Sequence, residues 1–231
     1  MVKAKVKGVL GRETFDFFRA LARNNHKEWM DANRERYRAC IVQPMRRLFE
    51  ELTPGVLRLN PGFDVRGKTG ANFSRINRDI RFANDKTLYK SRMYLKFAVP
   101  GQRGREGGEL YVGLAKDVVT VGFRVYSGAK RRESALALVA EPRVAAKPNW
   151  IRQQKKRLGP KYESYWYANV KGEWTKHEGW PEDAANWKRL RAWIVRKKVS
   201  CAAATRSAFV VDAGKAFREL YPLLEFTSLE R

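Results

Sequence analysis

The sequence contains few of the residues that most often cross-link a fold or bind a metal. Its 231 residues include only two cysteines, Cys40 and Cys201, and two histidines, His26 and His177. Cysteines this far apart, outside any C-x-x-C pair, are no disulfide framework and are typical of the reducing cytoplasm. Neither histidine stands at ligand spacing from a cysteine or from the other histidine, so we expect no metal and no cofactor.

Long hydrophobic runs are also missing. No segment approaches the roughly 18 consecutive apolar residues that a membrane-spanning helix needs. The N-terminus, MVKAKVKGVLGRETF, is basic but lacks the apolar stretch of a signal peptide. We therefore expect a soluble protein of the cytoplasm with no membrane span.

Acidic residues are scarce in comparison with basic ones. The chain has 24 Asp and Glu against 48 Lys and Arg, which gives a net charge of +24. Such an excess attracts polyanions, so the expected partner is a polyanion or another phosphate-bearing ligand, with nucleic acid as one candidate. The same charge would also serve solubility alone, and it therefore does not identify a ligand by itself.

Hydrophobic patterning predicts an α+β fold. Helical spacing covers residues 13–54, with a cap at Thr14, an end of the first helix at Asn24-Asn25, a kink at Pro44 and a stop at Thr53-Pro54-Gly55. Residues 92–126 are typical of three strands of an antiparallel sheet, and residues 207–211 are a candidate further strand. The sheet is expected to pack against N-terminal and C-terminal helices.

We predict a single domain, because the chain shows no internal repeat and no linker. A basic lead-in of residues 1–12 precedes the α+β domain of residues 13–231. The domain comprises an N-terminal helical part (13–54), the motif and sheet (56–126) and a helical second half (131–231). In that second half we expect helices at 134–139, at 149–158, from Pro181 through PEDAANWKRLRAWIVRKKV, and after Asp212.

Two local patterns resemble binding sites but have simpler explanations. Residues 62–69 match the phosphate loop G-x4-G-K-[ST], yet neither a strand before nor a helix after is predicted, so we interpret the match as coincidence. An aromatic cluster between 162 and 180 resembles a stacking surface for single-stranded bases, but we favour a place in the core. That cluster comprises Tyr162, Tyr165, Trp166, Tyr167, Trp174 and Trp180, interleaved with Lys161, Lys171 and Lys176.

The segment SRINRDIRFANDKTLYKSRMYLKF, residues 74–97, carries the main candidate site. Its arginines recur at every third position, and a planar guanidinium offers two parallel donors to a phosphate or a carboxylate. We predict an anion-binding site made by Arg75, Arg78, Arg81, Lys86, Tyr89 and Lys90.

Asp79 and Asp85 of this segment leave three alternatives open. They could orient the arginines around an anion, or one of them could be the general base of an enzyme acting on a small phosphorylated or carboxylated substrate. They could also form a structural ion-pair network in a protein-interaction scaffold. Two carboxylates cannot neutralise three arginines and two lysines, so the surplus faces either water or an anion. No nucleophile stands out, and we rank binding above catalysis.

The same segment and the N-terminal helix resemble an uncharacterised bacterial and fungal family called domain of unknown function 2461. The first shared pattern, L-x-x-N-N-x-x-x-W-[FM], falls here on Leu21, Asn24, Asn25, Trp29 and Met30. The second, R-[IV]-x-R-D-x-R-F-x-x-D-K-x-P-Y-K, runs from Arg75 through Phe82 to Lys90, with Leu88 in place of the proline. The resemblance is strongest over residues 15–100 and implies a mixed α+β domain without an established reaction. We expect Asn24, Asn25 and Trp29 to support the site.

Overall fold

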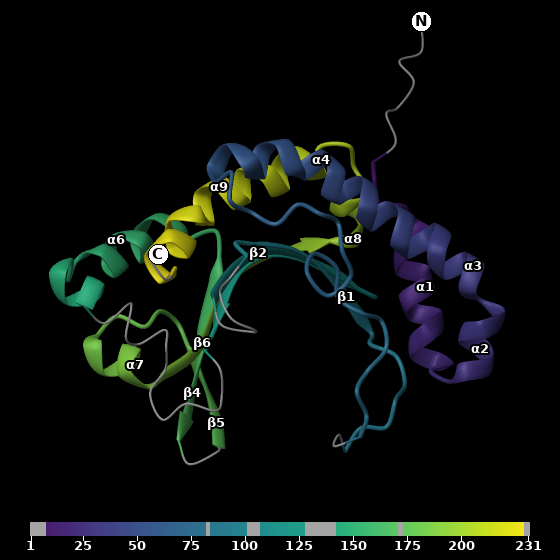
Figure 1. Cartoon of the computed structure of the whole chain (residues 1–231), viewed down its shortest axis with the longest axis horizontal. Helices are drawn as coiled ribbons and strands as arrows, with labels where there is room; N and C mark the ends of the chain where they lie inside the picture. Colours follow the sequence, from purple (N-terminus) through teal and green to yellow (C-terminus); the bar gives the residue numbers. More distant parts are fainter. Residues whose placement is uncertain (1–7, 82–83, 101–106, 128–141, 171–172, 229–231) are drawn as a thin grey trace, which may run out of the picture. The chain divides into compact units, whose positions relative to one another are not determined.

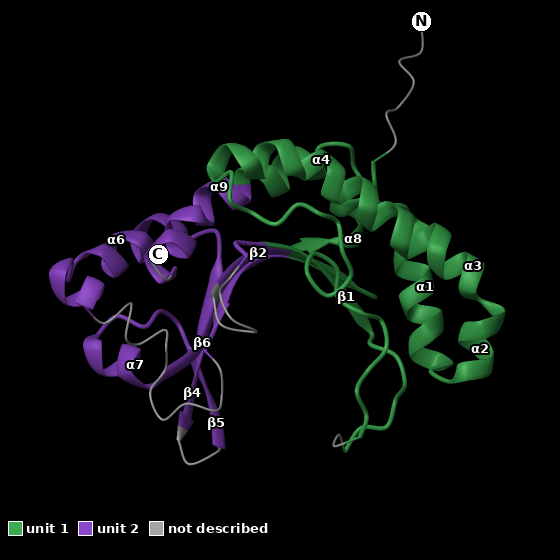
Figure 2. Ribbon diagram, in the orientation of Figure 1, with its two compact units in different colours: residues 1–97, 112–120, 198–215 green, residues 98–111, 121–197, 216–231 purple. Residues whose placement is uncertain are grey.

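The computed structural model describes residues 8–81, 84–100, 107–127, 142–170 and 173–228 (Figure 1). The chain divides into two compact units (Figure 2). Unit 1 comprises Met1–Phe97, Val112–Thr120 and Lys198–Lys215, and unit 2 comprises Ala98–Tyr111, Val121–Lys197 and Ala216–Arg231. The predicted helix at 134–139 and the Gly-rich residues 101–106 lie outside the described residues.

Helices and strands alternate in blocks along the chain. The helices are α1 (Arg12–Arg23), α2 (Lys27–Ala32), α3 (Arg34–Tyr37), the π-helix η1 (Arg38–Val42), α4 (Gln43–Leu59), α6 (Trp150–Leu158), α7 (Ala184–Arg189), α8 (Cys201–Ala204) and α9 (Phe209–Thr227). The strands are β1 (Arg92–Ala98), β2 (Gly107–Ala115), β3 (Val118–Tyr126), β4 (Glu163–Val170), β5 (Glu173–Glu178) and β6 (Leu190–Ser200).

The strands form an antiparallel sheet in the order β1-β2-β3-β6-β4-β5, which packs against α4 and α9. The predicted α+β class is therefore confirmed, as are the three strands between residues 92 and 126. Phe49 of α4 stacks on Phe97 of β1 with ring centroids 4.9 Å apart. A Cβ on Gly108 of β2 would lie 3.3 Å from Leu224 of α9, so helix and strand are in close contact there.

The second half contains more strand than the sequence predicts. The predicted helix from Pro181 ends at Arg189, and residues 190–200 form β6 instead. Four consecutive residues of β6, from Ala192 to Val195, are at most 4% exposed, so both faces of the strand are buried. A strand covered on both faces shows no period of two, and its apolar run cannot be distinguished from a buried helix by periodicity.

The candidate strand at residues 207–211 is also wrong. Phe209 is the first residue of α9, and Asp212 lies in its first turn. Phe209, Ala213, Ala216, Phe217 and Leu220 are all at most 4% exposed. Their spacing of three, four and seven residues is that of one helical face, which accounts for the helix. By contrast, the predicted helix at 149–158 is confirmed as α6.

The core of unit 2 is rich in tryptophan. Trp180 and Trp187 approach Trp193 of β6 edge-on, each with ring centroids 5.5 Å apart. The indole N–H of Trp193 donates to Ser164 Oγ at 3.0 Å. Of the aromatic cluster, Tyr162, Trp166 and Trp180 are buried as predicted, whereas Trp174 is 49% exposed. Tyr165 and Tyr167, in alternate positions of β4, are half-buried.

Pro44 does not break the helical run of unit 1 but is the second residue of α4, directly after the π-helix η1. Pro44 has no N–H to donate to the carbonyl of Cys40, four residues earlier. That carbonyl accepts a hydrogen bond from the hydroxyl of Thr14 at 2.8 Å. Thr14 therefore joins α1 to η1, and the cap predicted for it is wrong, since Gly11 holds the N-cap position.

The stop predicted at Thr53-Pro54-Gly55 is wrong as well, because α4 continues to Leu59. Leu52 is 3% exposed and Val56 is 1% exposed, and they lie one turn apart on the same helical face. Burial of this face outweighs the helix-breaking tendency of proline and glycine. The predicted end of the first helix is confirmed, since Asn24 is the C-cap of α1.

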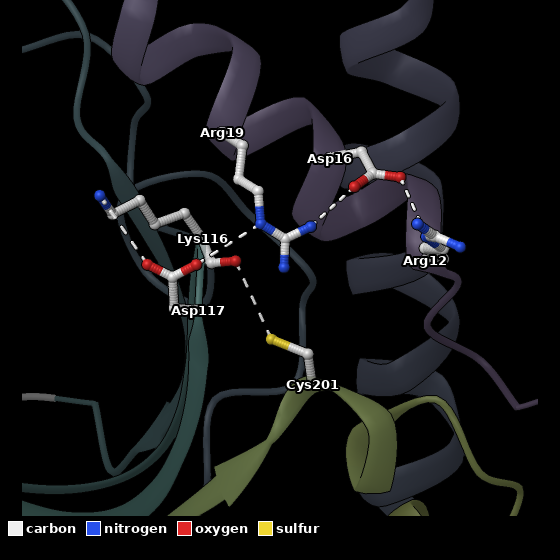
Figure 3. Close-up of polar contacts among 6 residues, drawn as sticks. All are labelled: Arg12, Asp16, Arg19, Lys116, Asp117 and Cys201. Atoms are coloured by element: carbon white, nitrogen blue, oxygen red, sulfur yellow. Dashed lines mark hydrogen bonds and ion pairs between the residues drawn. The ribbon is translucent and has the colours of Figure 1, made fainter.

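A chain of charges joins α1 to the turn between β2 and β3 within unit 1 (Figure 3). Arg19 donates to Asp16 at 2.7 Å and to Asp117 at 3.4 Å. These groups are about half exposed, so we assign each pair only a small contribution to stability. Nearby, the Cys201 thiol donates to the carbonyl of Lys116, and burial raises the pKa of this thiol, which disfavours a reactive thiolate.

Candidate functional site

The motif segment doubles back on itself in unit 1. The N–H of Arg78 donates to the carbonyl of Leu88 at 2.9 Å, and the N–H of Lys90 donates to that of Ile76 at 2.8 Å. Between these bonds Asn77 and Tyr89 form an antiparallel bridge. The segment therefore forms a short antiparallel ladder, and Phe82 lies outside the described residues.

Asn25 holds this ladder to the helices. Its side-chain amide donates to the carbonyl of Tyr89 and accepts from the N–H of Tyr89, both at 2.9 Å. Asn24 instead donates to the carbonyl of Ala20 in α1, and the Trp29 ring lies 5.6 Å from that of Phe17. Of the three expected supporting residues, only Asn25 touches the motif directly in these contacts.

Both aspartates of the motif are engaged with arginines. Arg81 donates two hydrogen bonds to Asp79, at 3.0 and 2.8 Å, and Arg78 donates to Asp85. The Arg81 guanidinium lowers the pKa of Asp79, and hydrogen bonds from Thr87 and Arg78 lower that of Asp85. A general base works best with a pKa near the working pH. These exposed carboxylates are moved away from that value, which disfavours the general-base alternative.

Three basic side chains of the motif, Arg75, Lys86 and Lys90, remain after this pairing without a carboxylate partner among the described residues. Lys86 donates to the carbonyl of Ile80 at 3.2 Å. Arg75 and Lys90 make no side-chain hydrogen bond or ion pair to the residues that the structure describes. Tyr89 is 6% exposed, and the contacts it makes to Asn25 come from its backbone. The motif therefore carries three charges without a described carboxylate partner, and among them Arg75 and Lys90 are the two whose side chains make no hydrogen bond to the described residues.

Arg75 lines a pocket of about 380 Å³ within unit 1, and it is the only one of the six predicted anion-binding residues among the described lining residues. The pocket lies between η1 and α4 on one side and residues 69–77 on the other. It is lined by Tyr37, Val42, Met45, Arg46, Thr69, Phe73, Ser74, Arg75, Ile76, Asn77 and Met93. Its volume falls in the lower range of small-molecule sites.

Arg46 of α4 is the second cation of this pocket, and sequence reasoning missed it. It is exposed and, within the described ranges, makes no side-chain hydrogen bond or ion pair. In sequence it is one of several basic residues on the polar face of the helix, so spacing does not single it out. Burial raises the pKa of the Tyr37 hydroxyl at the same pocket, which keeps that phenol neutral at physiological pH.

Asn72, also missed, fixes the loop that forms one wall of the pocket. It is 1% exposed, donates to the carbonyls of Asp64 and Lys96 at 2.6 and 3.3 Å, and accepts from the N–H of Lys68 at 3.2 Å. Thr69 and Phe73, on either side of it, line the pocket. A buried side-chain amide that serves three backbone groups is typical of a loop with one defined conformation.

The match of residues 62–69 to a phosphate loop has no supporting structure. Helix α4 precedes it where a strand would be required, and turns follow it where a helix would be required. The N–H of Lys68 is bonded to Asn72 and is not available to a phosphate. The interpretation as coincidence is thus consistent with the local geometry.

Replacing Asn25 with alanine should release the ladder without unfolding unit 1. The substitution removes both bonds to the Tyr89 backbone, which is buried, and the expected loss of stability is about 1–3 kcal/mol. Native-state hydrogen exchange is the measurement, and the amides of Arg78, Tyr89 and Lys90 should exchange faster. The control is Asn33→Ala, which removes a bond within α2, from its side chain to Trp29. Equal protection of the ladder in both variants would contradict the role of Asn25.

Among the residues described, no group of three or more His, Cys, Asp and Glu side chains is placed to hold a metal ion. Within the same ranges, none of the helices combines the length and apolar character needed to cross a membrane.

Comparison with known proteins assigns the family. A search of the curated proteins finds no match to this chain. A family model described as conserved hypothetical protein (DUF2461) matches residues 13–226, which extends well beyond the expected range of 15–100 into the second half. The chain therefore belongs to the DUF2461 family of conserved hypothetical proteins.

Proposed function

We propose that this protein binds a phosphate-bearing ligand through Arg75 of the motif and Arg46 of α4. The observation that supports the proposal is that these two arginines line one pocket and have no carboxylate partner among the described residues. Two guanidinium groups beside a concave surface can donate several hydrogen bonds to a phosphate. The positive charge of the chain favours the approach of such a ligand.

The remaining charged residues of the motif have a supporting role in this proposal. Arg78 and Arg81 are each paired with an aspartate, and Lys86 holds a backbone carbonyl. These contacts shape the ladder that presents Arg75. In this proposal the ion pairs of Arg78 and Arg81 are structural, and they support the binding site. Catalysis by Asp79 or Asp85 is disfavoured, because the pKa values of both carboxyl groups are lowered.

Nucleic acid is one candidate source of the phosphate, and it offers the first test. Affinity for a short fluorescent single-stranded oligonucleotide is measured by anisotropy at low and moderate salt. We expect Arg46→Ala combined with Arg75→Ala to weaken binding by about 100-fold, since each lost hydrogen bond to a charged group contributes about 1.5–3 kcal/mol. The dependence of affinity on salt should also become less steep.

The matched control is Arg47→Ala combined with Arg58→Ala, which removes the same charge from exposed positions of α4 outside the pocket. A second comparison is Arg78→Ala combined with Arg81→Ala. If all three double variants lose affinity equally, binding follows the general positive field and the proposal is wrong. If the Arg78 and Arg81 variant alone loses affinity, the site lies on the ladder and not in the pocket.

A further inference from the structure

The pocket of Arg46 and Arg75 has a floor that a phosphate alone would not fill. Met45, Phe73, Ile76 and Met93 line it and are between 2% and 8% exposed. The floor is apolar, whereas the two cations lie on exposed residues. A phosphate held by the arginines would leave this apolar surface in contact with water, which is unfavourable by about 25 cal/mol for each Å².

The floor is held in place from behind. The Phe73 ring lies 5.3 Å from that of Phe49, which in turn stacks on Phe97 at 4.9 Å. Ser74 contributes its hydroxyl, which accepts from the N–H of Tyr94 at 2.9 Å. A floor supported by packed rings and a bonded loop is formed before any ligand arrives, which lowers the cost of binding.

The wall formed by the helices contains the π-helix η1. Tyr37 immediately precedes η1, Val42 ends it, and both line the pocket. A π-helix is rare and occurs frequently at functional sites, because one extra residue in the turn changes the direction of the side chains that follow. Here those following residues are Met45 of the floor and Arg46 beside it. The irregularity thus brings an apolar and a cationic group to the same pocket.

We infer that the ligand joins a phosphate to one flat apolar ring and is about the size of a mononucleotide. This inference rests on the proposed function, since the phosphate is placed at Arg46 and Arg75. The ring lies on the floor, where the thioethers of Met45 and Met93 and the Phe73 ring make favourable contacts with an aromatic group. A pocket of about 380 Å³ accommodates one such unit and not a stack of several.

Phenyl phosphate and methyl phosphate test this inference, because both present a phosphate monoester and differ in the ring. Binding is measured by isothermal titration calorimetry with the full chain. We expect phenyl phosphate to bind at least about 10-fold more tightly than methyl phosphate, since the ring removes apolar surface from water. The heat capacity change on binding should be more negative for phenyl phosphate, which is the marker of apolar burial.

A variant that fills the pocket tests the contribution of the ring separately from that of the phosphate. Asn77 lines the pocket, is exposed, and its side chain has no partner in the described part of the chain. Asn77→Trp should abolish the preference for phenyl phosphate, and Asn77→Ala should keep it. The inference about the ring would be wrong if the unmodified protein bound the two esters equally well. If the Arg46 and Arg75 double variant then bound neither ester, the proposed phosphate site would still hold. If the unmodified protein binds neither ester, the proposed function and the inference are both wrong.

Discussion

Replacing Trp193 with alanine is expected to lower the free energy of unfolding of unit 2 by about 3–5 kcal/mol. Trp193 is 0% exposed, and Phe123, Trp180 and Trp187 all approach its ring edge-on. Its removal would leave a cavity too large for these rings to close and would leave Ser164 without its indole donor. Urea unfolding followed by far-UV circular dichroism measures the loss.

The matched control for this prediction is Trp174→Ala. Trp174 is 49% exposed on β5, so its loss should change the stability by no more than about 0.5 kcal/mol. Similar losses in the two variants would show that Trp193 is not the centre of a packed core.

Replacing Asn72 with leucine is expected to lower the free energy of unfolding by about 2–4 kcal/mol, although the two side chains have nearly the same size. Leucine cannot donate to the carbonyls of Asp64 and Lys96 or accept from the N–H of Lys68. Those backbone groups would lose their hydrogen-bond partner. Asn72 is only 1% exposed, so water cannot easily replace it. Leucine is the informative replacement because it preserves volume, so the loss reports hydrogen bonds and not a cavity.

The same variant should weaken the binding of phenyl phosphate, because Thr69 and Phe73 belong to the loop that Asn72 fixes and both line the pocket. Thermal unfolding and calorimetric titration measure the two effects. The control is Asn84→Leu at an exposed position without a side-chain partner among the described residues, which should change neither quantity appreciably. Unchanged stability of Asn72→Leu would show that the loop does not depend on this amide.

The candidate site could be predicted only in part. The basic motif directed attention to Arg75, and the excess of cations over carboxylates indicated that part of the charge remains unpaired. Arg46 was not predictable, because it joins Arg75 only when residues 69–77 fold beside α4. Arg78 and Arg81 have the same sequence spacing as Arg75, and only the structure distinguishes them by giving each an aspartate.

The sequence by itself determined the features that depend on local chemistry. These include the end of α1 at Asn24, the helix α6 before Gly159-Pro160, and the alternation of β1 with one face buried. The charge of the motif and its resemblance to the DUF2461 family also follow from sequence alone.

Only the tertiary structure decided the elements whose residues are buried on every side. Residues 192–195 are apolar without a period, and they became strand because β4 pairs with them and the tryptophans cover them. The strand predicted at residues 207–211 and the helix end predicted at Pro54 both rest on local conformational preference. That preference changes the free energy of a helix or strand by up to about 1 kcal/mol for most residues and by about 3 kcal/mol for a proline inside a helix. From Phe209 onward and at Pro54 the chain is helical in the structure. Phe209 is buried in α9, and Leu52 and Val56 are buried in α4. Burying one such side chain contributes about 1.5–3 kcal/mol, so several together outweigh the local preference.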